Sequence, residues 1–161
     1  MDVDSVTWSK DRWTEAGQPE AEHFAAMTAI LRLHVVVVGA LDRALRAHEL
    51  SRTGYLIMAT LRISQHRTMT ITSLGRSLLL HPTTISVAVD QLATRDLLDR
   101  RTCPEDRRTV QTSLTGRGTA VMDSVTNALA DGHYGLSGVS DRLAITLTEV
   151  IRQVRQSLGD Q

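Results

Sequence analysis

The sequence predicts a mainly α-helical fold with a small β-hairpin (α+β), in which helices at both ends of the chain flank a small central lobe. Three observations predict this fold class. Apolar side chains recur at helical spacing over residues 24–48, two strand-like runs over residues 97–102 and 109–114 are joined by a polar turn, and a second apolar helical stripe covers residues 140–158. With 161 residues, 42% of them hydrophobic, the chain is long enough to bury a core.

The N-terminal part of the chain is expected to be an arm followed by a long helix. Residues 1–19 show little periodicity, so we expect an arm with one short helix over residues 8–14. Spacings of three and four then alternate along Phe24, Met27, Leu31, His34, Val38, Leu41, Leu45 and His48. This pattern predicts one long helix, although residues 35–38 alone would also be typical of a strand.

Three shorter helices are expected in the middle of the chain. The first covers residues 53–64 and is expected to turn three side chains inward, Leu56, Ile57 and Leu61. Residues 70–80 indicate a short strand entry followed by a helix that uses Leu74 and Leu78. Proline suits the first turn of a helix, so Pro82 opens a third helix over residues 82–95, whose inward stripe is Ile85, Val89 and Leu92.

The hairpin and two more helices complete the expected order. Thr115 is an N-cap for a helix that runs to about residue 130, and a glycine-rich break follows over residues 132–138. The last helix carries an apolar stripe of Leu143, Leu147, Val150, Val154 and Leu158. The stripes at the two ends of the chain are too long for the small lobe to cover, so the pattern predicts a homodimer that buries them.

The charge of the chain is polarised along its length. The net charge is zero, yet residues 1–22 hold six acids and two bases, while residues 62–117 hold nine arginines and five acids. Seventeen of the eighteen bases are arginine, which forms bidentate contacts with phosphate. A net charge of zero argues against a nucleic-acid partner, whereas the excess of arginine in the middle of the chain favours one.

Composition also bounds the surroundings in which the chain works. The longest apolar run, around residues 35–38, is shorter than a membrane span, and the acidic N-terminus lacks the apolar core of a secretory signal. A single cysteine, Cys103, excludes an internal disulfide framework. We therefore expect a cytoplasmic protein with no membrane partner.

The helices over residues 70–80 and 82–95 match a helix-turn-helix, whose second helix enters the major groove of DNA. The outer face of the second helix is polar and rich in hydroxyls, and it consists of Thr83, Thr84, Ser86, Val87, Asp90 and Gln91. Hydroxyl and amide groups can hydrogen-bond to base edges or phosphates, and methyl groups can contact thymine. The alternative is a helix face that is polar only because it is solvated.

The hairpin tip strengthens the prediction of double-stranded DNA as the partner. It places Arg107 and Arg108 beside two acids, and arginine in a narrow minor groove is a recurrent DNA anchor. Asp106 lies two residues before Arg108, so the two side chains can point the same way. The alternative is a salt-bridged surface turn.

The segments DRRTVQTSLTGRG, residues 106–118, and HPTTISVAVDQLATRDLLDRR, residues 81–101, resemble the MarR family of winged helix-turn-helix transcriptional regulators. The resemblance implies that Arg108 reaches the minor groove, that Asp106 orients it, and that Arg107 is more variable. It also implies that helix 82–95 reads the major groove. Two positions depart from the family: Val87 replaces a commonly basic residue, and Asp96 replaces a helix-ending glycine, which Asp can imitate in a left-handed conformation.

The resemblance further implies a homodimeric repressor that acts on a near-palindromic operator and is released by a small aromatic effector. It divides the chain into an arm (1–19), a helical dimerisation region (20–52 and 115–161) and a winged helix-turn-helix lobe (53–114). Candidate effector-binding residues are Trp13, His34, Tyr55 and Arg62. Trp13 is shared with a urate-responsive branch, but Leu56 and Val87 depart from that branch. Trp13 could instead pack the arm, and His34 could belong to the helical seam.

Other function classes find little support in the sequence. No phosphate-binding loop, nucleophile elbow or metal triad is visible, so no enzyme, cofactor or metal site is expected. Cys103 could sense oxidants beside the hairpin arginines, or it could be an unreactive thiol. A helical interaction module without DNA binding, such as an antirepressor, remains the main alternative.

Overall fold

The computed structural model describes residues 4–102 and 110–159. Seven α-helices, one 3₁₀ helix and three strands follow one another within these residues. Their order is α1 (Ser5–Glu15), α2 (Ala21–Arg46), α3 (Arg52–Ile63), β1 (Thr68–Thr70), α4 (Ile71–Leu78), α5 (Pro82–Thr94), β2 (Leu98–Thr102), β3 (Val110–Leu114), α6 (Gly116–Asp131), η1 (His133–Gly135) and α7 (Asp141–Ser157). The mainly helical fold with a small hairpin is thereby confirmed.

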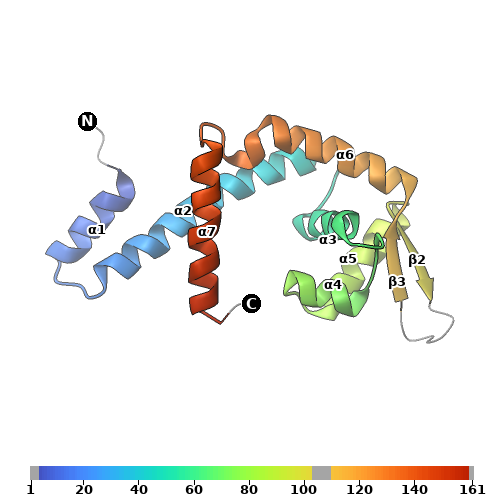
Figure 1. Ribbon diagram of the computed structural model, residues 1–161, viewed down its shortest axis with the longest axis horizontal. Coiled ribbons are helices and arrows are strands. Elements are labelled where there is room, and N and C mark those ends of the chain that lie inside the picture. Colours follow the sequence, from blue (N-terminus) through green and yellow to red (C-terminus); the bar gives the residue numbers. More distant parts are fainter. Residues whose placement is uncertain (1–3, 103–109, 160–161) are drawn as a thin grey trace.

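The molecule is elongated, with a globular lobe at one end and helices at the other (Figure 1). The lobe contains α3, α4, α5 and the sheet, while α1 lies at the far end of α2. The long helices α2 and α6 pack side by side above the lobe, and α7 crosses in front of α2 in this view. The lobe and α1 therefore lie at opposite ends of the molecule.

The core of the lobe is formed by the inward stripes of its helices. Ile57, Leu61, Leu74, Ile85 and Val89 are fully buried there. Leu45 from the end of α2 and Met122, Val125 and Leu129 from α6 belong to the same cluster. The lobe is thus anchored on α2 and α6 by apolar burial, the dominant favourable term in folding.

Two details differ from the sequence-based prediction. Leu56, expected to face inward, is 41% exposed, because the buried side of α3 is formed by Gly54, Ile57, Met58 and Leu61. The hairpin is also part of a larger sheet, since β1 pairs antiparallel with β3 and gives the order β1-β3-β2. The strand before α4 was foreseen, but its partner lies more than forty residues away in sequence.

Large apolar side chains lie on the surface of this single chain. On α2 they are Met27, Ile30, Leu31, Val35 and Val36, and on α7 they are Leu143, Ile145, Val150, Ile151 and Val154, with Leu158 directly after the helix. By length and composition, α2 is also apolar enough to cross a membrane, with a mean hydropathy of 2.0 over its most apolar 18 residues. The expectation based on the longest apolar run missed this property, because that run is interrupted by single polar residues while the average stays high.

The N-terminal arm folds back on α2 as a short helical hairpin. The Trp13 ring stacks on Phe24 with a centroid separation of 4.0 Å, and its Nε1 donates a hydrogen bond to the Pro19 carbonyl at 2.8 Å. Lys10 and Glu22 form an ion pair between the two helices. The contacts of Trp13 are those of a residue that packs the arm.

Replacing Gly118 by alanine is expected to destabilise the lobe by about 1–3 kcal/mol, because a Cβ there overpacks a tight contact. An added Cβ would lie 2.0 Å from the Leu97 carbonyl oxygen, so α6 and the start of β2 would have to separate. Urea unfolding measures the change. Gly116→Ala is the matched control on the same helix, since no atom lies within 4 Å of its added Cβ. Equal stability of the two variants would contradict this account.

Candidate nucleic-acid interface

The turn between α4 and α5 is short because three local features close it. Leu79 adopts a left-handed conformation with φ of 53°, and the Leu80 N–H donates to the Gly75 carbonyl at 2.9 Å. Gly75 permits this approach, since a Cβ there would lie 2.9 Å from the Leu80 carbonyl oxygen. The His81 ring nitrogen Nδ1 then accepts from the Thr83 N–H at 3.2 Å and caps α5, which begins at Pro82. A helix-turn-helix results.

The end of α5 is a Schellman turn. The Asp96 N–H donates to the Ala93 carbonyl at 2.9 Å, and the Leu97 N–H donates to the Leu92 carbonyl at 3.0 Å. Asp96 has a φ of 56°, so the prediction that it takes the left-handed conformation of a helix-ending glycine is confirmed. This turn leads directly into β2 and fixes the hairpin relative to α5.

The five residues predicted to read bases lie on α5, opposite or beside its buried stripe. Thr83, Thr84, Val87 and Gln91 are exposed, and Ser86 is half-buried. Val87, at 52% exposure, is an apolar side chain in the middle of this polar face. We define these five residues as the reading face of α5.

A shallow groove lies on each side of this reading face. One, of about 390 Å³, separates α5 from the start of α3 and is lined by Ser51, Thr53, Thr83, Thr84, Val87, Ala88 and Gln91. The other, of about 490 Å³, lies toward the sheet and is lined by Thr70, Ile71, Thr72, Ser73, Ser86, Arg100 and Val110. The sequence did not single out Ser51, Thr53 or Arg100, because nothing local shows which residues flank α5.

Two helices begin at the first groove. The Ser51 hydroxyl accepts from the Gly54 N–H at 3.0 Å and caps α3, while α5 begins at Pro82 beside Thr83 and Thr84. Helix N-termini carry a partial positive charge and unpaired N–H groups. The two helix N-termini therefore favour anions at this groove, although no arginine is among the described residues that line it.

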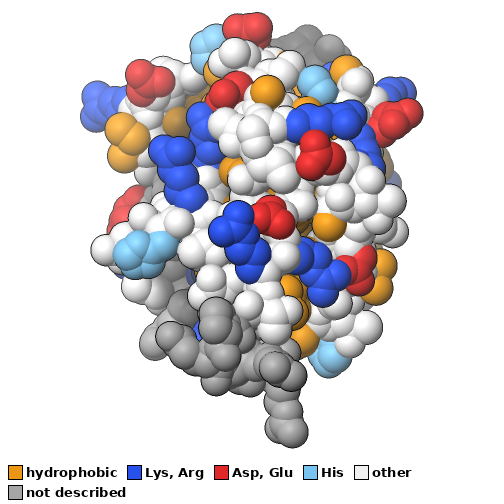
Figure 2. Space-filling model, turned by 90° about the vertical axis from the view of Figure 1, so that its right-hand side faces the viewer, with side chains coloured by type: hydrophobic (Ala, Val, Ile, Leu, Met, Phe, Trp, Pro, Cys, Tyr) orange, Lys and Arg blue, Asp and Glu red, His pale blue; other side chains and the backbone are white. Residues whose placement is uncertain are grey.

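The charges around the reading face are mixed in sign. Arg100 of β2 forms an ion pair with Asp90 of α5. At the start of α3, Arg52 donates two hydrogen bonds to Asp42 of α2, at 2.7 and 2.8 Å, and these hold the pKa of the Asp42 carboxyl below its ordinary value. Figure 2, a view onto the lobe end of the molecule, shows basic side chains spread over the face with acidic ones between them. The surface is therefore not a continuous basic patch.

The predicted wing residues Asp106, Arg107 and Arg108, together with Cys103, lie outside the described residues. The strands that carry them are described. Arg101 of β2 opposes Gln111 of β3, and Leu98 opposes Leu114 at the base of the hairpin. Their roles in DNA contact and oxidation stay predictions.

The four predicted effector-binding residues lie in different parts of the structure. Trp13 packs the arm, His34 is exposed on α2, and Arg62 pairs with Asp123 of α6 at 2.5 Å. Tyr55 is half-buried, and burial raises the pKa of its phenol, with a smaller contribution from nearby Tyr134 of η1. None of the four lines either groove beside α5. Within residues 4–102 and 110–159, no three His, Cys, Asp or Glu side chains gather as metal ligands.

Comparisons with known proteins agree with this geometry. The family model described as "MarR family" matches residues 50–110, which include the helix-turn-helix and the first strand of the hairpin. No curated protein sequence matches the chain significantly.

Several solved structures share the fold. A MarR-family transcriptional regulator of Streptomyces coelicolor is 23% identical, with a TM-score of 0.78 over 88% of this chain and 98% of that one. A point mutant of Escherichia coli MarR, solved with operator DNA, is 18% identical, with a TM-score of 0.73 over 83% of this chain and 95% of that one. BpsR of Bordetella bronchiseptica, whose DNA binding is regulated by 6-hydroxynicotinic acid, is 16% identical, with a TM-score of 0.69 over 79% and 90%.

The match of the family model and the shared architecture converge on the same segment. The turn between α4 and α5, the end of α5 and the start of the hairpin all lie inside the matched residues. Residues 50–110 of this chain therefore match the MarR-family model, and the chain as a whole has the fold of the solved MarR-family regulators.

Proposed function

We propose that the protein is a transcriptional regulator that binds duplex DNA sequence-specifically and that inserts α5 into the major groove. The observation that carries the proposal is the reading face of α5: an exposed row of Thr83, Thr84, Val87 and Gln91, with Ser86 beside it, on a helix held by a tight turn at one end and a Schellman turn at the other. Its hydroxyl, amide and methyl groups suit base edges. A helix face that is polar only because it contacts solvent would not need well-defined turns at both ends of its helix.

Phosphate contacts would come from the flanks of the reading face. The helix N-termini at the first groove offer N–H groups and hydroxyls to one DNA strand. The hairpin would carry Arg108, oriented by Asp106 and assisted by Arg107, toward the adjacent minor groove. This arrangement needs few arginines on α5 itself, which accounts for a DNA-binding lobe in a chain of zero net charge.

The active species would be a homodimer. The exposed apolar rows on α2 and α7 are larger than isolated surface residues require, and pairing of two chains would cover both rows. A twofold dimer presents two copies of α5 to half-sites about 34 Å apart on a near-palindrome. The relative solved with operator DNA supports this mode of binding.

We further infer that the regulator is a repressor whose DNA binding a small aromatic molecule relieves. Support comes from the relative regulated by 6-hydroxynicotinic acid and from the half-buried Tyr55 phenol, a candidate effector-binding group on α3. Addition of 6-hydroxynicotinate and related aromatic acids to the protein–DNA complex tests this step. Release by none of a panel of such acids would count against it.

The experiment that tests DNA binding is fluorescence anisotropy on duplexes from beside the gene of this protein, with random DNA as control, at two salt concentrations. We expect saturable binding to one fragment, at least about 1,000-fold tighter than to random DNA, with affinity that falls steeply with salt. Selection from a random duplex library covers operators elsewhere. If neither yields a preferred sequence at low salt, the protein is an interaction module on this fold, and partner capture becomes the next step.

A further inference from the structure

Arg95 joins the end of α5 to the end of α2. Its Nη1 donates to the Glu49 carbonyl and its Nη2 to the His48 carbonyl, both at 2.7 Å. These carbonyls belong to the turn that follows α2, where Glu49 adopts a left-handed conformation with φ of 51°. One side chain thus bridges two helix ends that lie 46 and 47 residues apart in sequence.

The chemistry at both ends suits this bridge. Carbonyls at the C-terminus of a helix have no intrahelical partner and attract cations. A guanidinium presents paired donors in a fixed plane, so it can hold two successive carbonyls at once, whereas an ammonium concentrates its charge at one point. Bonds in which the donor is charged are the stronger kind.

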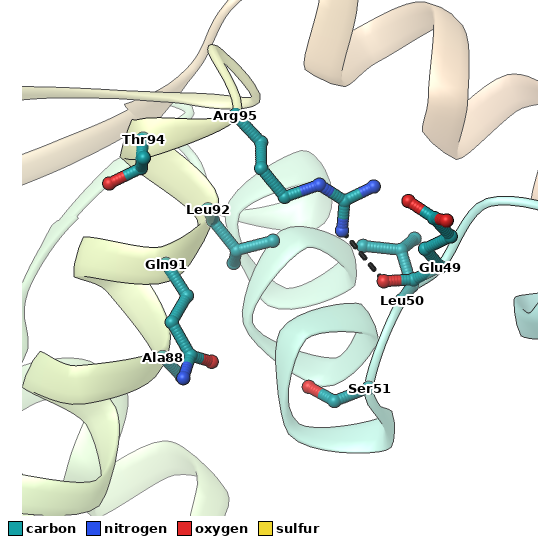
Figure 3. Close-up of a pocket in the computed structure, with 8 residues that line it drawn as sticks. All are labelled: Glu49, Leu50, Ser51, Ala88, Gln91, Leu92, Thr94 and Arg95. Carbon is teal, nitrogen blue, oxygen red and sulfur yellow. Dashed lines mark hydrogen bonds between the residues drawn. The ribbon is translucent and has the colours of Figure 1, made fainter.

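Apolar packing connects these segments only at the base of a hollow on this side of the lobe. A hollow of about 460 Å³ lies between the segment after α2 and the second half of α5, and its lining residues are Glu49, Leu50, Ser51, Ala88, Gln91, Leu92, Thr94 and Arg95. Figure 3 shows the Arg95 side chain reaching toward the backbone of Glu49. The floor of the hollow, Leu50, Ala88 and Leu92, is buried in the core of the lobe. The lobe is therefore expected to fold without the bridge, which holds the two helix ends across an open gap.

We propose that Arg95 is a positioning residue, which fixes the angle of α5 relative to α2 and thereby sets the half-site spacing that the dimer accepts. The proposal rests on the proposed function, because spacing has meaning only for a dimer that binds DNA. In such a dimer, α2 connects the two lobes. If the angle of α5 relative to α2 can vary, the distance between the two reading faces therefore varies as well. The Asp42–Arg52 pair fixes the start of α3 to α2, and Arg95 adds the connection to α5 itself.

The test uses duplexes that the unmodified full-length chain selects from a random library, together with versions that carry one or two extra base pairs between the half-sites. Each added pair moves one half-site by about 3.4 Å and turns it by about 34°, so the unmodified protein should lose about 30-fold or more in affinity. Arg95→Ala should lose less than about 5-fold on the same change, because its lobes can follow the displaced half-site. The readout is the ratio of affinities for two duplexes within one preparation, which any loss of folded protein cancels.

Two further variants separate positioning from a general structural effect. Arg95→Met keeps the apolar stem of the side chain and should relax spacing as Arg95→Ala does, whereas Arg95→Lys should restore part of the discrimination. Arg12→Ala, which removes one positive charge from α1 at the far end of the molecule, should keep the full spacing penalty. If Arg95→Ala and Arg95→Met keep the penalty of the unmodified protein, the positioning role is overturned while the proposed function stands. If the unmodified protein selects no duplex, the proposed function fails, and this inference fails with it.

Discussion

Val87→Glu is expected to lower affinity for the operator about 100-fold, which corresponds to about 2.7 kcal/mol of binding free energy. Val87 lies in the middle of the reading face and is 52% exposed, so a carboxylate there would face the electronegative groove of DNA. The loss arises from like-charge repulsion and from desolvation of the new charge. Fluorescence anisotropy at fixed salt measures it.

The fold should tolerate this substitution, because the side chain leaves no cavity and glutamate favours helices more than valine does. Two variants serve as controls. Ile63→Glu places the same charge on α3 at a side chain that is 83% exposed, and it should keep the affinity of the unmodified protein. Val87→Lys reverses the sign at the same position and should raise affinity for all duplexes by adding a phosphate contact. Unchanged operator affinity of Val87→Glu would remove α5 from the interface.

Val154→Glu is expected to raise the dissociation constant of the homodimer by at least about 100-fold, because a carboxylate would replace an apolar side chain in the interface. Val154 is 46% exposed on the apolar row of α7. A chain that acted alone would have no reason to expose five large apolar side chains on this one helix. In a twofold dimer the substitution enters the interface twice. Sedimentation velocity over a range of concentrations measures the shift from dimer to monomer.

Gln156→Glu provides the matched control. It adds the same charge two residues further along α7, on the polar side of the helix, and should leave the dimer intact. A dimer that Val154→Glu does not weaken would exclude α7 from the interface. A chain that sediments with membranes and needs detergent for extraction would instead assign the apolar surface of α2 to a lipid environment.

Much of the secondary structure could be predicted because its causes are local. The long helix, the N-cap at Thr115, the break before α7 and the left-handed Asp96 all depend on residues within a few positions of one another. The buried stripe of α5 followed from helical periodicity, and the reading face is what remains on the other side of that helix. The sequence therefore placed the candidate base-reading residues on one exposed helix face.

The tertiary structure alone decided the contacts between distant segments. It paired β1 with β3, exposed Leu56, stacked Trp13 on Phe24 and brought Asp90 to Arg100. It also joined Arg95 to the carbonyls after α2, a contact that no periodicity or motif in the sequence predicts. The spacing of apolar residues shows which side of a helix or strand will be buried, because the tendency of each residue to be buried depends on its own side chain. The partner that covers that side depends on how whole elements pack, and that choice is made by contacts between residues far apart in the chain.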